Sequence, residues 1–261
     1  MSEDRDVLRL AERLAREAGE LQRERFATAI EIRTKSSSVD LVTDVDHACE
    51  ALIVDALSAE RPDDAILAEE GRGRDRPDAP WRWIIDPLDG TTNYAHGYPR
   101  FCVSIGVERE GSRAVGVVYD PLLDELFSAV RGEGATLNGR PLRVSEVDEL
   151  GQSLLATGFA YDVRRNPRDN VNHFIAFLKS SRALRRDGSA ALDLAYVAAG
   201  RFDGFWELRL HAWDVAAGLL LVEEAGGRTS DLAGAAPPPS GAECLASNGR
   251  IHDAMLEILR G

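Results

Sequence analysis

The first half of the chain passes from helical spacing of apolar residues to β-like runs. One face of residues 4–26 is apolar, with Val7, Leu10, Ala11, Leu14, Ala18 and Leu21. Because Glu and Arg fill the other faces, this stripe predicts an amphipathic helix. Residues 27–34 suit a short extended segment, and a second helix is predicted near 46–59. Residues 83–145 contain several β-like runs without a helix between them, which indicates a largely antiparallel or mixed sheet.

Beyond residue 152, predicted strands and helices alternate. Strands are predicted at 153–160, 182–186, 202–208 and 243–247, and helices at 168–180, 188–199, 214–225 and 251–259. In the helix at 168–180, we expect Phe174, Phe177 and Leu178 to share one side. Gly226 and Gly227 end the helix at 214–225, as a left-handed C-cap requires.

This alternation predicts an α/β (α+β) protein with mixed sheets. No internal repeat and no clear linker divide the chain, and a soft seam lies near 145–152. We expect an N-terminal α+β subdomain over residues 1–150, with most of the metal and phosphate ligands. Residues 151–261 would then form a C-terminal α/β subdomain.

Composition narrows the class of protein. The chain has 261 residues, 44% hydrophobic and 29% charged, which suits one large domain or two closely packed subdomains. Its net charge is −13, from 31 basic and 44 acidic residues. No basic tract alternates with aromatic residues, so we expect no nucleic-acid partner. The global field does not favour an anionic substrate, so local cations would have to hold one.

Cysteine usage and the first residues indicate the compartment. Cys49, Cys102 and Cys244 are far apart and form no Cys-x-x-Cys pair, which argues against a disulfide framework and a zinc ribbon. The first residues are acidic and lack the apolar core of a signal peptide. No run approaches the ~18–20 apolar residues of a membrane span. We therefore expect a cytoplasmic protein with no membrane partner.

The most distinctive stretch is residues 83–93, Trp-Ile-Ile-Asp-Pro-Leu-Asp-Gly-Thr-Thr-Asn. An apolar, β-like run ends there in Asp86 and Asp89. Carboxylates at the end of a buried strand are unfavourable unless a positive charge meets them. The small residues that follow can turn their backbone N–H groups toward an anion. The stretch therefore predicts a metal site beside a phosphate site.

Two further acidic residues extend this candidate site. Glu69 follows a short, strand-like run, and Asp214 lies at the start of a predicted helix. With Asp86 and Asp89 they offer the oxygen ligands that hard cations such as Mg²⁺ prefer. No Cys or His cluster competes for zinc. Two such ions a few ångström apart can activate a water molecule and stabilise the leaving oxygen.

The aspartate pair also has structural interpretations. Asp, Pro and Gly are all turn formers, so residues 86–90 suit an ordinary turn. A calcium-binding EF-hand loop is excluded, because it needs Gly at position 6 and Glu at position 12. Counted from Asp86, Gly90 is at position 5 and Gly97 at position 12.

Other acidic residues have simple alternatives too. Asp214 can be the N-cap of its helix, and Asp44 or Asp46 can cap the helix near 46–59. Taken alone, Glu69 is an ordinary surface glutamate. These alternatives stay open at the level of the sequence.

Together, these segments resemble the signatures of the inositol monophosphatase family. Residues 83–96, which end in Asn-Tyr-Ala-His, resemble its first signature. Residues 213–218 (Trp-Asp-Val-Ala-Ala-Gly), continuing to Glu-Ala-Gly-Gly at 224–227, resemble the second. Lys35-Ser36-Ser37, followed by residues 39–43 and Asp46, resembles an N-terminal block. The resemblance covers essentially the whole chain.

The resemblance implies a Mg²⁺-dependent, lithium-sensitive phosphomonoesterase with a layered αβαβα sandwich of the sugar-phosphatase type. It also implies two or three Mg²⁺ ions and a homodimer. By motif position the metal ligands are Glu69, Asp86, the backbone carbonyl of Leu88, Asp89 and Asp214. The catalytic residues that orient the attacking water are Asp46 and Thr91. The substrate contacts are Gly90, Thr91, Gly188, Ser189, Ala190 and Glu207.

One departure from the family pattern affects the ligand set. The family usually has Gly before its paired glutamates, whereas this chain has Ala68. Glu70 is therefore an alternative ligand to Glu69. The nucleophile is expected to be water, because no Cys or Ser lies beside a plausible base.

The substrate also stays open. Myo-inositol 1-phosphate is the simplest choice, and relatives of this fold act on histidinol phosphate, NADP(H), fructose bisphosphate or phosphoadenosine nucleotides. Glu207 suits hydrogen bonding to a polyol, whereas Arg185, Arg186 and Arg209 favour a second anionic group. A non-catalytic regulatory protein on this scaffold should lack a metal ligand or the water-orienting pair, and this chain has them all.

Overall fold

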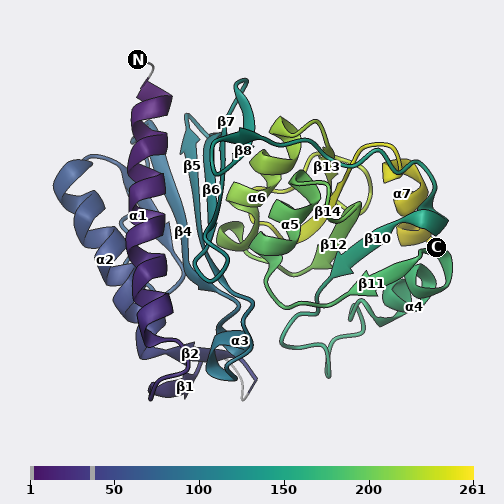
Figure 1. The fold of residues 1–261 in the computed structure, drawn as a ribbon, viewed down its shortest axis with the longest axis horizontal. Coiled ribbons are helices and arrows are strands. Elements are labelled where there is room, and N and C mark those ends of the chain that lie inside the picture. Colours follow the sequence, from purple (N-terminus) through teal and green to yellow (C-terminus); the bar gives the residue numbers. More distant parts are fainter. Residues whose placement is uncertain (1–2, 36–38) are drawn as a thin grey trace.

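The computed structural model describes residues 3–35 and 39–261, arranged in five layers, αβαβα (Figure 1). The expected layered sandwich is confirmed. Ser36 and Ser37, part of the N-terminal block, lie outside the described residues. The first layer contains α1 (Glu3–Arg25) and α2 (Asp44–Glu60), side by side on one face of the first sheet. Helix α1 buries Val7, Ala11, Leu14 and Ala18 of the predicted stripe, whereas Leu10 and Leu21 are partly buried. It begins with acidic residues, as its dipole favours.

The second layer is a seven-stranded mixed sheet in the described part of the chain, with the order β3-β4-β5-β6-β7-β8-β9. Its strands are β3 (Ala65–Ala68), β4 (Trp81–Asp89), β5 (Cys102–Arg109), β6 (Ser112–Asp120), β7 (Glu125–Val130), β8 (Gly134–Leu137) and β9 (Arg140–Pro141). Strands β3 and β4 are parallel, and the other neighbours are antiparallel. The sheet is mixed and largely antiparallel, as predicted.

Strand β4 is buried along nearly its whole length, and its pairing with β5 shifts between Asp86 and Asp89. Such a shift bends the strand end and redirects its side chains. Pro87 lies inside the irregularity, where its missing N–H leaves no sheet partner unsatisfied. The short helix α3 (Thr91–Ala95) follows directly, so the expectation that no helix lies between the strands of residues 83–145 is wrong. Helix α3 lies near the hairpin of β1 (Ile32–Thr34) and β2 (Leu41–Thr43) (Figure 1).

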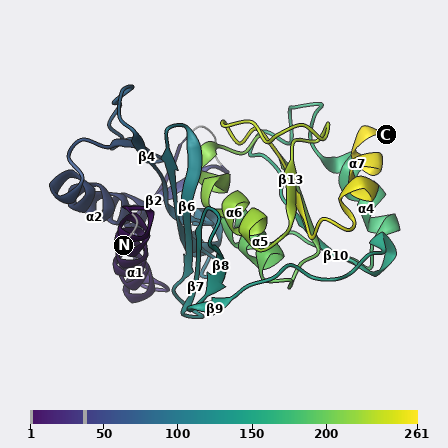
Figure 2. The same cartoon turned by 90° about the horizontal axis from the view of Figure 1, so that it is seen from above.

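The third layer contains α5 (Ala190–Ala198) and α6 (Ala212–Glu224), between the two large sheets (Figure 2). Helix α6 approaches the first sheet very closely. A Cβ on Gly106 would lie 2.6 Å from the Cβ of Ala216, and one on Gly116 would lie 2.7 Å from the carbonyl oxygen of Ala217. Only glycine at these two sheet positions leaves room for the helix backbone.

The fourth layer is a five-stranded sheet, again among the described residues, with the order β11-β10-β12-β14-β13. Its strands are β10 (Leu154–Thr157), β11 (Ala183–Arg185), β12 (Gly204–Leu208), β13 (Arg228–Ser230) and β14 (Glu243–Ser247). The short 3₁₀ helix η1 (Leu150–Gln152) precedes β10. The outermost layer contains α4 (Val171–Ser180) and α7 (His252–Arg260) (Figure 2).

One expectation about α4 is wrong. Phe177 is fully buried against Trp206, with ring centroids 4.1 Å apart. Leu178, expected on the same side, is 56% exposed. The two residues are consecutive, and consecutive positions on a helix point about 100° apart. Phe177 lies on the packed face of α4, and Leu178 lies on its exposed face.

The two large sheets occupy separate parts of the chain. The first is built from residues 65–141 and the second from residues 154–247. The division at residue 150 stays a prediction, since α6 from the second part packs on the sheet of the first. None of the described helices is long and apolar enough to cross a bilayer.

Candidate active site

The candidate site begins at the irregular end of β4. Asp86 is 2% exposed and Asp89 is 8% exposed. Burial raises the pKa of Asp86 well above its ordinary value, and the nearby carboxylates of Glu69, Asp89 and Asp214 raise it further. Like charges that raise one another's pKa lie close together in space. The fold thus brings together the four acidic residues that the sequence singled out.

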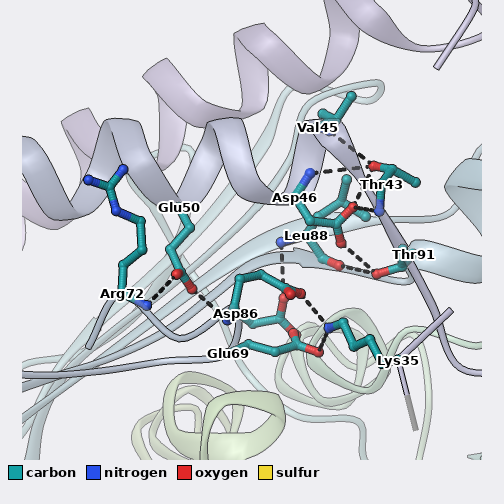
Figure 3. A network of polar contacts seen from close by, with 11 residues as sticks. Lys35, Thr43, Val45, Asp46, Glu50, Glu69, Arg72, Asp86, Leu88 and Thr91 are labelled. Carbon is teal, nitrogen blue, oxygen red and sulfur yellow. Dashed lines mark hydrogen bonds and ion pairs between the residues drawn. The ribbon is translucent and has the colours of Figure 1, made fainter. Parts of the chain in front are cut away.

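Glu69 and Glu70 differ in where their side chains lie. Glu69 extends the pairing of β3 with β4, its N–H 3.2 Å from the carbonyl oxygen of Ile85, and it lines the cavity beside Asp86. The Glu70 side chain is 4% exposed and does not line the cavity. Lys35 forms ion pairs with both glutamates, and its Nζ lies 2.8 Å from Glu69 Oε1 (Figure 3). This geometry favours Glu69 over Glu70.

Glu50, which the sequence interpretation missed, fixes the backbone that follows this pair. Its carboxylate accepts hydrogen bonds from the N–H groups of Glu70 (2.6 Å) and Arg72 (2.8 Å) (Figure 3). Glu50 is fully buried on α2. A charge-assisted bond to each of two N–H groups holds the turn after β3 in place.

Asp46 and Thr91 form a buried pair. The Thr91 hydroxyl lies 2.8 Å from Asp46 Oδ1 and 3.1 Å from the carbonyl oxygen of Leu88 (Figure 3). Asp46 Oδ2 accepts a bond from the Thr43 N–H at 2.9 Å, within a capping box in which Thr43 is the N-cap of α2. Asp46 therefore takes part in capping and also reaches Thr91. Asp44 instead forms an ion pair with Arg25.

Gly90 joins β4 to α3 in a conformation that favours glycine. Its φ is 94°, in the left-handed region. A Cβ there would lie 2.8 Å from the carbonyl oxygen of Arg100. Both the conformation and the lack of space therefore require glycine between Asp89 and Thr91.

Asp214 reaches the same site from α6. It is the third residue of the helix rather than its N-cap, a position that His211 occupies. The His211 N–H donates to Asp214 Oδ2 at 2.6 Å. Burial, with Glu69 and Asp89 nearby, raises the pKa of Asp214 well above its ordinary value. Asp214 is therefore bonded as a helix-capping side chain and also lies among the carboxylates.

The N-terminus of α5 holds Asp89 from the other side. Asp89 Oδ2 accepts hydrogen bonds from the Ser189 hydroxyl (2.7 Å) and the Ala191 N–H (2.8 Å). The sequence placed Ser189 among the substrate contacts with Gly188 and Ala190. All three line the cavity, yet Ser189 is 1% exposed and its hydroxyl is already bonded to Asp89.

Glu207 lies on β12, across the cavity. It is 8% exposed, and a Cβ on Gly158 would lie 2.2 Å from Glu207 Oε2. Burial raises the pKa of this carboxyl well above its ordinary value, and Asp214 raises it further. In the part of the chain that the structure describes, its oxygens accept no hydrogen bond. They are available to hydroxyl donors of a ligand.

One cavity of about 530 Å³ joins these residues. The predicted site residues that line it are Glu69, Asp86, Leu88, Asp89, Gly90, Thr91, Gly188, Ser189, Ala190, Glu207 and Asp214. Asp46 lies behind Thr91 and does not line it. Residues as distant in sequence as Glu69 and Asp214 therefore share one concave surface of a size typical of small-molecule sites.

The acidic cluster has the donor set of a hard-cation site. Within residues 3–35 and 39–261, no three acidic, His or Cys side chains as they stand enclose a single metal position. The carboxylates of Glu69, Asp89 and Asp214 nevertheless raise the pKa of Asp86, so a bound cation would stabilise the charged forms. Lys35 supplies a positive charge at Glu69. Oxygen ligands of this kind fit Mg²⁺ rather than a soft metal.

Two supporting residues were missed by the sequence interpretation. Arg100 is 8% exposed, forms an ion pair with Asp193 at 3.0 Å and stacks over the ring of Tyr196 at 4.1 Å. Gln22 is fully buried on α1. The sequence contains a sign of both contacts. Asp193, the partner of Arg100, interrupts an apolar helix, and Gln22 stands where the spacing of Leu14 and Ala18 predicts an apolar residue.

Comparison with known proteins places this site in a family. A profile of the inositol monophosphatase family matches residues 3–261. Inositol-1-monophosphatase of Synechocystis is 46% identical over 229 residues, which cover 88% of this chain and 80% of that protein. Nus factor SuhB of Escherichia coli is 45% identical over 256 residues, 97% of this chain and 96% of that protein.

A solved structure shows the same fold. Inositol monophosphatase from Anabaena superimposes with a TM-score of 0.89 at 43% identity, covering 98% of this chain and 96% of the other. The match extends over both large sheets and the helices between them. The chain therefore belongs to the inositol monophosphatase family and is a phosphoric monoester hydrolase.

Proposed function

We propose that this protein is a Mg²⁺-dependent phosphatase that hydrolyses a small phosphate monoester, with inositol monophosphate as the most direct candidate. The observation that carries the proposal is the gathering of Glu69, Asp86, Asp89 and Asp214 around one cavity. Hydrolysis of a phosphate monoester dianion is accelerated when cations neutralise the charge at the attacking and leaving oxygens. Two buried carboxylates, Asp86 and Asp89, and two half-buried ones, Glu69 and Asp214, can hold the cations needed for this.

The proposed ligands for two or three Mg²⁺ ions are Glu69, Asp86, the carbonyl oxygen of Leu88, Asp89 and Asp214. When bound, the ions lower the pKa of water and neutralise the phosphate. Asp86 Oδ1 accepts the Leu88 N–H at 3.0 Å, which orients the carboxylate and the neighbouring carbonyl group together. The α5 N-terminus fixes Asp89 in the same manner. The ligands are thus supported by hydrogen bonds before any ion binds.

Thr91 and Asp46 are proposed to orient the attacking water. The Thr91 hydroxyl can donate to Asp46 Oδ1 and accept from water, so the water proton is aligned by a buried pair. Asp46 is held by Thr43, and burial raises the pKa of its carboxyl. The backbone N–H groups of Gly90 and Thr91 are proposed to bind the phosphate. Water is the nucleophile, so no phosphoenzyme forms.

Glu207 is proposed to hold the alcohol part of the substrate. Its buried carboxylate accepts no hydrogen bond from the described residues, and a polyol offers two neighbouring hydroxyl donors. Unpaired buried acceptors favour ligands that satisfy them and reject ligands that lack the hydroxyls. Inositol meets this requirement better than a substrate without vicinal hydroxyls.

The test is release of inorganic phosphate under Mg²⁺ from a panel of monoesters. The panel contains inositol 1-phosphate, histidinol phosphate, NADP⁺, fructose 1,6-bisphosphate and a 3′-phosphoadenosine nucleotide. We expect turnover of inositol 1-phosphate, loss of activity with a chelator and inhibition by Li⁺. Absence of turnover with every substrate, or a trapped covalent phosphoryl group, would contradict the proposal.

A non-catalytic role on this scaffold is the second candidate, because the E. coli relative is named a Nus factor. Such a role does not require the acidic cluster, so Asp89→Asn would leave it unaffected. The family also suggests a homodimer in the cytoplasm. Light scattering on the purified chain tests the dimer directly.

A further inference from the structure

The candidate active site has two walls, which come from distant parts of the chain. Gly90 and Thr91, where β4 meets α3, belong to the wall proposed to bind the phosphate. Gly188, Ser189 and Ala190, where α5 begins, belong to the wall proposed to contact the alcohol. One substrate must touch both walls at once, so the alignment of the walls affects both binding and turnover.

The Asn93 side chain joins these two walls. Asn93 lies on α3 after Thr91, is half-buried and does not line the cavity. Its Nδ2 donates to the carbonyl oxygens of Arg100 at 2.7 Å and Asp187 at 2.8 Å, with a longer contact of 3.4 Å to that of Gly188. Asp187 and Gly188 are 94 and 95 residues away in the sequence. A single amide group therefore connects α3 to the turn before α5.

The groups that Asn93 contacts lie directly against the site. The Arg100 carbonyl oxygen adjoins Gly90, since a Cβ on Gly90 would lie 2.8 Å from it. On the other side, a Cβ on Gly188 would lie 3.3 Å from both Nδ2 and Oδ1 of Asn93. Gly188 has a left-handed φ of 79°, so the turn bends there without a side chain between its backbone and Asn93. The Asn93 amide thus meets both walls at close range.

The bonds of Asn93 differ in kind from the other bonds that hold the start of α5. The Ser189 hydroxyl and the Ala191 N–H donate to Asp89 Oδ2. Asp89 is a proposed metal ligand, so these two bonds depend on the charge and the ion occupancy of its carboxylate. The bonds of Asn93 join a neutral amide to backbone carbonyl oxygens, so they depend on neither. Asn93 can therefore hold α5 in one place whether or not an ion is bound.

We propose that Asn93 is a positioning residue that aligns the start of α5 with the phosphate-binding turn, and that it thereby determines selectivity for polyol phosphates over phosphate esters without further hydroxyl groups. The proposal rests on the proposed function for the roles of the two walls. Without the amide donors, the carbonyl oxygens on both walls lose a partner and the start of α5 is free to shift. Contacts to the alcohol are then misplaced, whereas the phosphate contacts at Gly90 and Thr91 remain.

The experiment measures selectivity rather than activity alone. Under Mg²⁺, kcat/KM is determined for inositol 1-phosphate and for phenyl phosphate, whose leaving group carries no further hydroxyl, and the ratio of the two values is the readout. Asn93→Leu keeps the approximate size of the side chain and removes its donors. We expect this ratio to be about 10-fold lower in Asn93→Leu than in the wild type. General damage to the metal ligands affects both substrates and cancels in the ratio.

Asn248 offers a matched control. It is 4% exposed, and its Nδ2 donates to Ser145 Oγ at 2.9 Å and to the carbonyl oxygen of Val147 at 2.7 Å, away from the cavity. Asn248→Leu should lower stability and leave the ratio unchanged. If Asn93→Leu does not fold, Asn93→Ser takes its place, because its short hydroxyl cannot bond carbonyl groups on both walls, and the ratio should again fall. An unchanged ratio in the folded Asn93 variant, or an equal fall in Asn248→Leu, would overturn the proposal.

Hydrogen exchange separates failure of this proposal from failure of the proposed function. Exchange of the Ala191 and Asp193 amides, which bond Asp89 and the Ser189 carbonyl, is measured with Mg²⁺ and without substrate. We expect about 10-fold faster exchange in Asn93→Leu and no change in Asn248→Leu. Exchange that Asn93→Leu does not alter would overturn the positioning role, whatever the enzyme hydrolyses. If the wild type hydrolyses neither ester, the selectivity falls with the proposed function, and the exchange rates alone decide the positioning role.

Discussion

Gln22 on α1 donates a hydrogen bond of 2.7 Å to the carbonyl oxygen of Pro87, the residue that follows Asp86. The backbone carbonyl oxygen of Gln22 accepts a hydrogen bond from the Tyr94 hydroxyl, also at 2.7 Å. A helix of the first layer therefore supports both the irregular end of β4 and the short helix that follows it. The bonds are buried, so the polar groups they join have no water to replace a lost partner.

Replacement of Gln22 by Leu should lower stability and activity together. The Pro87 carbonyl would lose its nearest donor, at a cost of about 1–3 kcal/mol in the free energy of unfolding. The bend that presents Asp86 and Asp89 would also be less well fixed. Urea unfolding and kcat/KM measure the two effects. Gln152→Leu is the control, because Gln152 bonds Glu149 on the surface; an equal loss there would rule out a specific role for Gln22.

Asp89→Asn should remove catalysis and leave the metal-free fold nearly intact. Asparagine keeps an oxygen to accept the Ser189 and Ala191 bonds, but it removes the charge proposed to bind Mg²⁺. We expect kcat to fall by more than about 100-fold, with little change in the thermal melt of the metal-free protein. Asp55→Asn, which alters an exposed ion pair with Arg72, is the control. Retained activity would remove Asp89 from the site.

Arg100→Met should be strongly destabilising. Arg100 and Asp193 are both buried, and removal of one partner leaves the other without its compensating charge. A loss of about 3 kcal/mol in the free energy of unfolding is expected. Burial already raises the pKa of Asp193 to about 8, so Asp193→Asn should cost less than Arg100→Met. Urea unfolding of both variants checks this order, and the reverse order would contradict the assignment.

His252 should make stability depend on pH. The buried ring lies 2.9 Å from the hydroxyls of Ser230 and Ser247, and burial lowers its pKa from 6.5 to about 4. Arg228 lowers the pKa further, and Asp253 opposes the shift. Because the folded-state pKa lies below the unfolded value, this stabilisation is complete above pH 6.5 and is lost as the pH falls toward 4.

The measurement is urea unfolding at pH 7.5 and pH 5. A loss of about 1.4 kcal/mol per pH unit is expected below pH 6.5 from this group. The variant His252→Gln should be less stable at pH 7.5 and should lose the His252 contribution to the slope. Identical pH profiles for wild type and His252→Gln would show that His252 does not cause the effect.

Much of the architecture follows from short-range patterns. The stripe on α1 and the glycine end of α6 gave helices near their observed bounds. The β-like runs of residues 83–145 gave a mixed sheet, but they did not indicate α3. Gly226 has the left-handed φ of 87° that its place after α6 indicated. Such features depend on neighbouring residues, so one sequence is enough to predict them.

The supporting contacts of the site depend on long-range packing, which the hydrophobic pattern along the chain does not predict. Arg100 meets Asp193 across 93 residues, and Gln22 meets Pro87 across 65. Periodicity marks Asp193 and Gln22 as exceptions on apolar faces without saying what they contact. The prediction for Leu178 is wrong for a related reason. Phe177 and Leu178 are both apolar, and which of them faces the core depends on the layer against which α4 packs.

The close approach of α6 to the first sheet makes the backbone itself a spacer within the proposed metal site. Asp214 is carried by α6, whereas Asp86 and Asp89 are carried by β4. The distance between α6 and the sheet at Gly106 and Gly116 therefore sets the distance between these two halves of the site. A single methyl group added at Gly116, which lines no part of the cavity, would push the halves apart. Cation affinity could then be adjusted from behind the site, with every ligand unchanged.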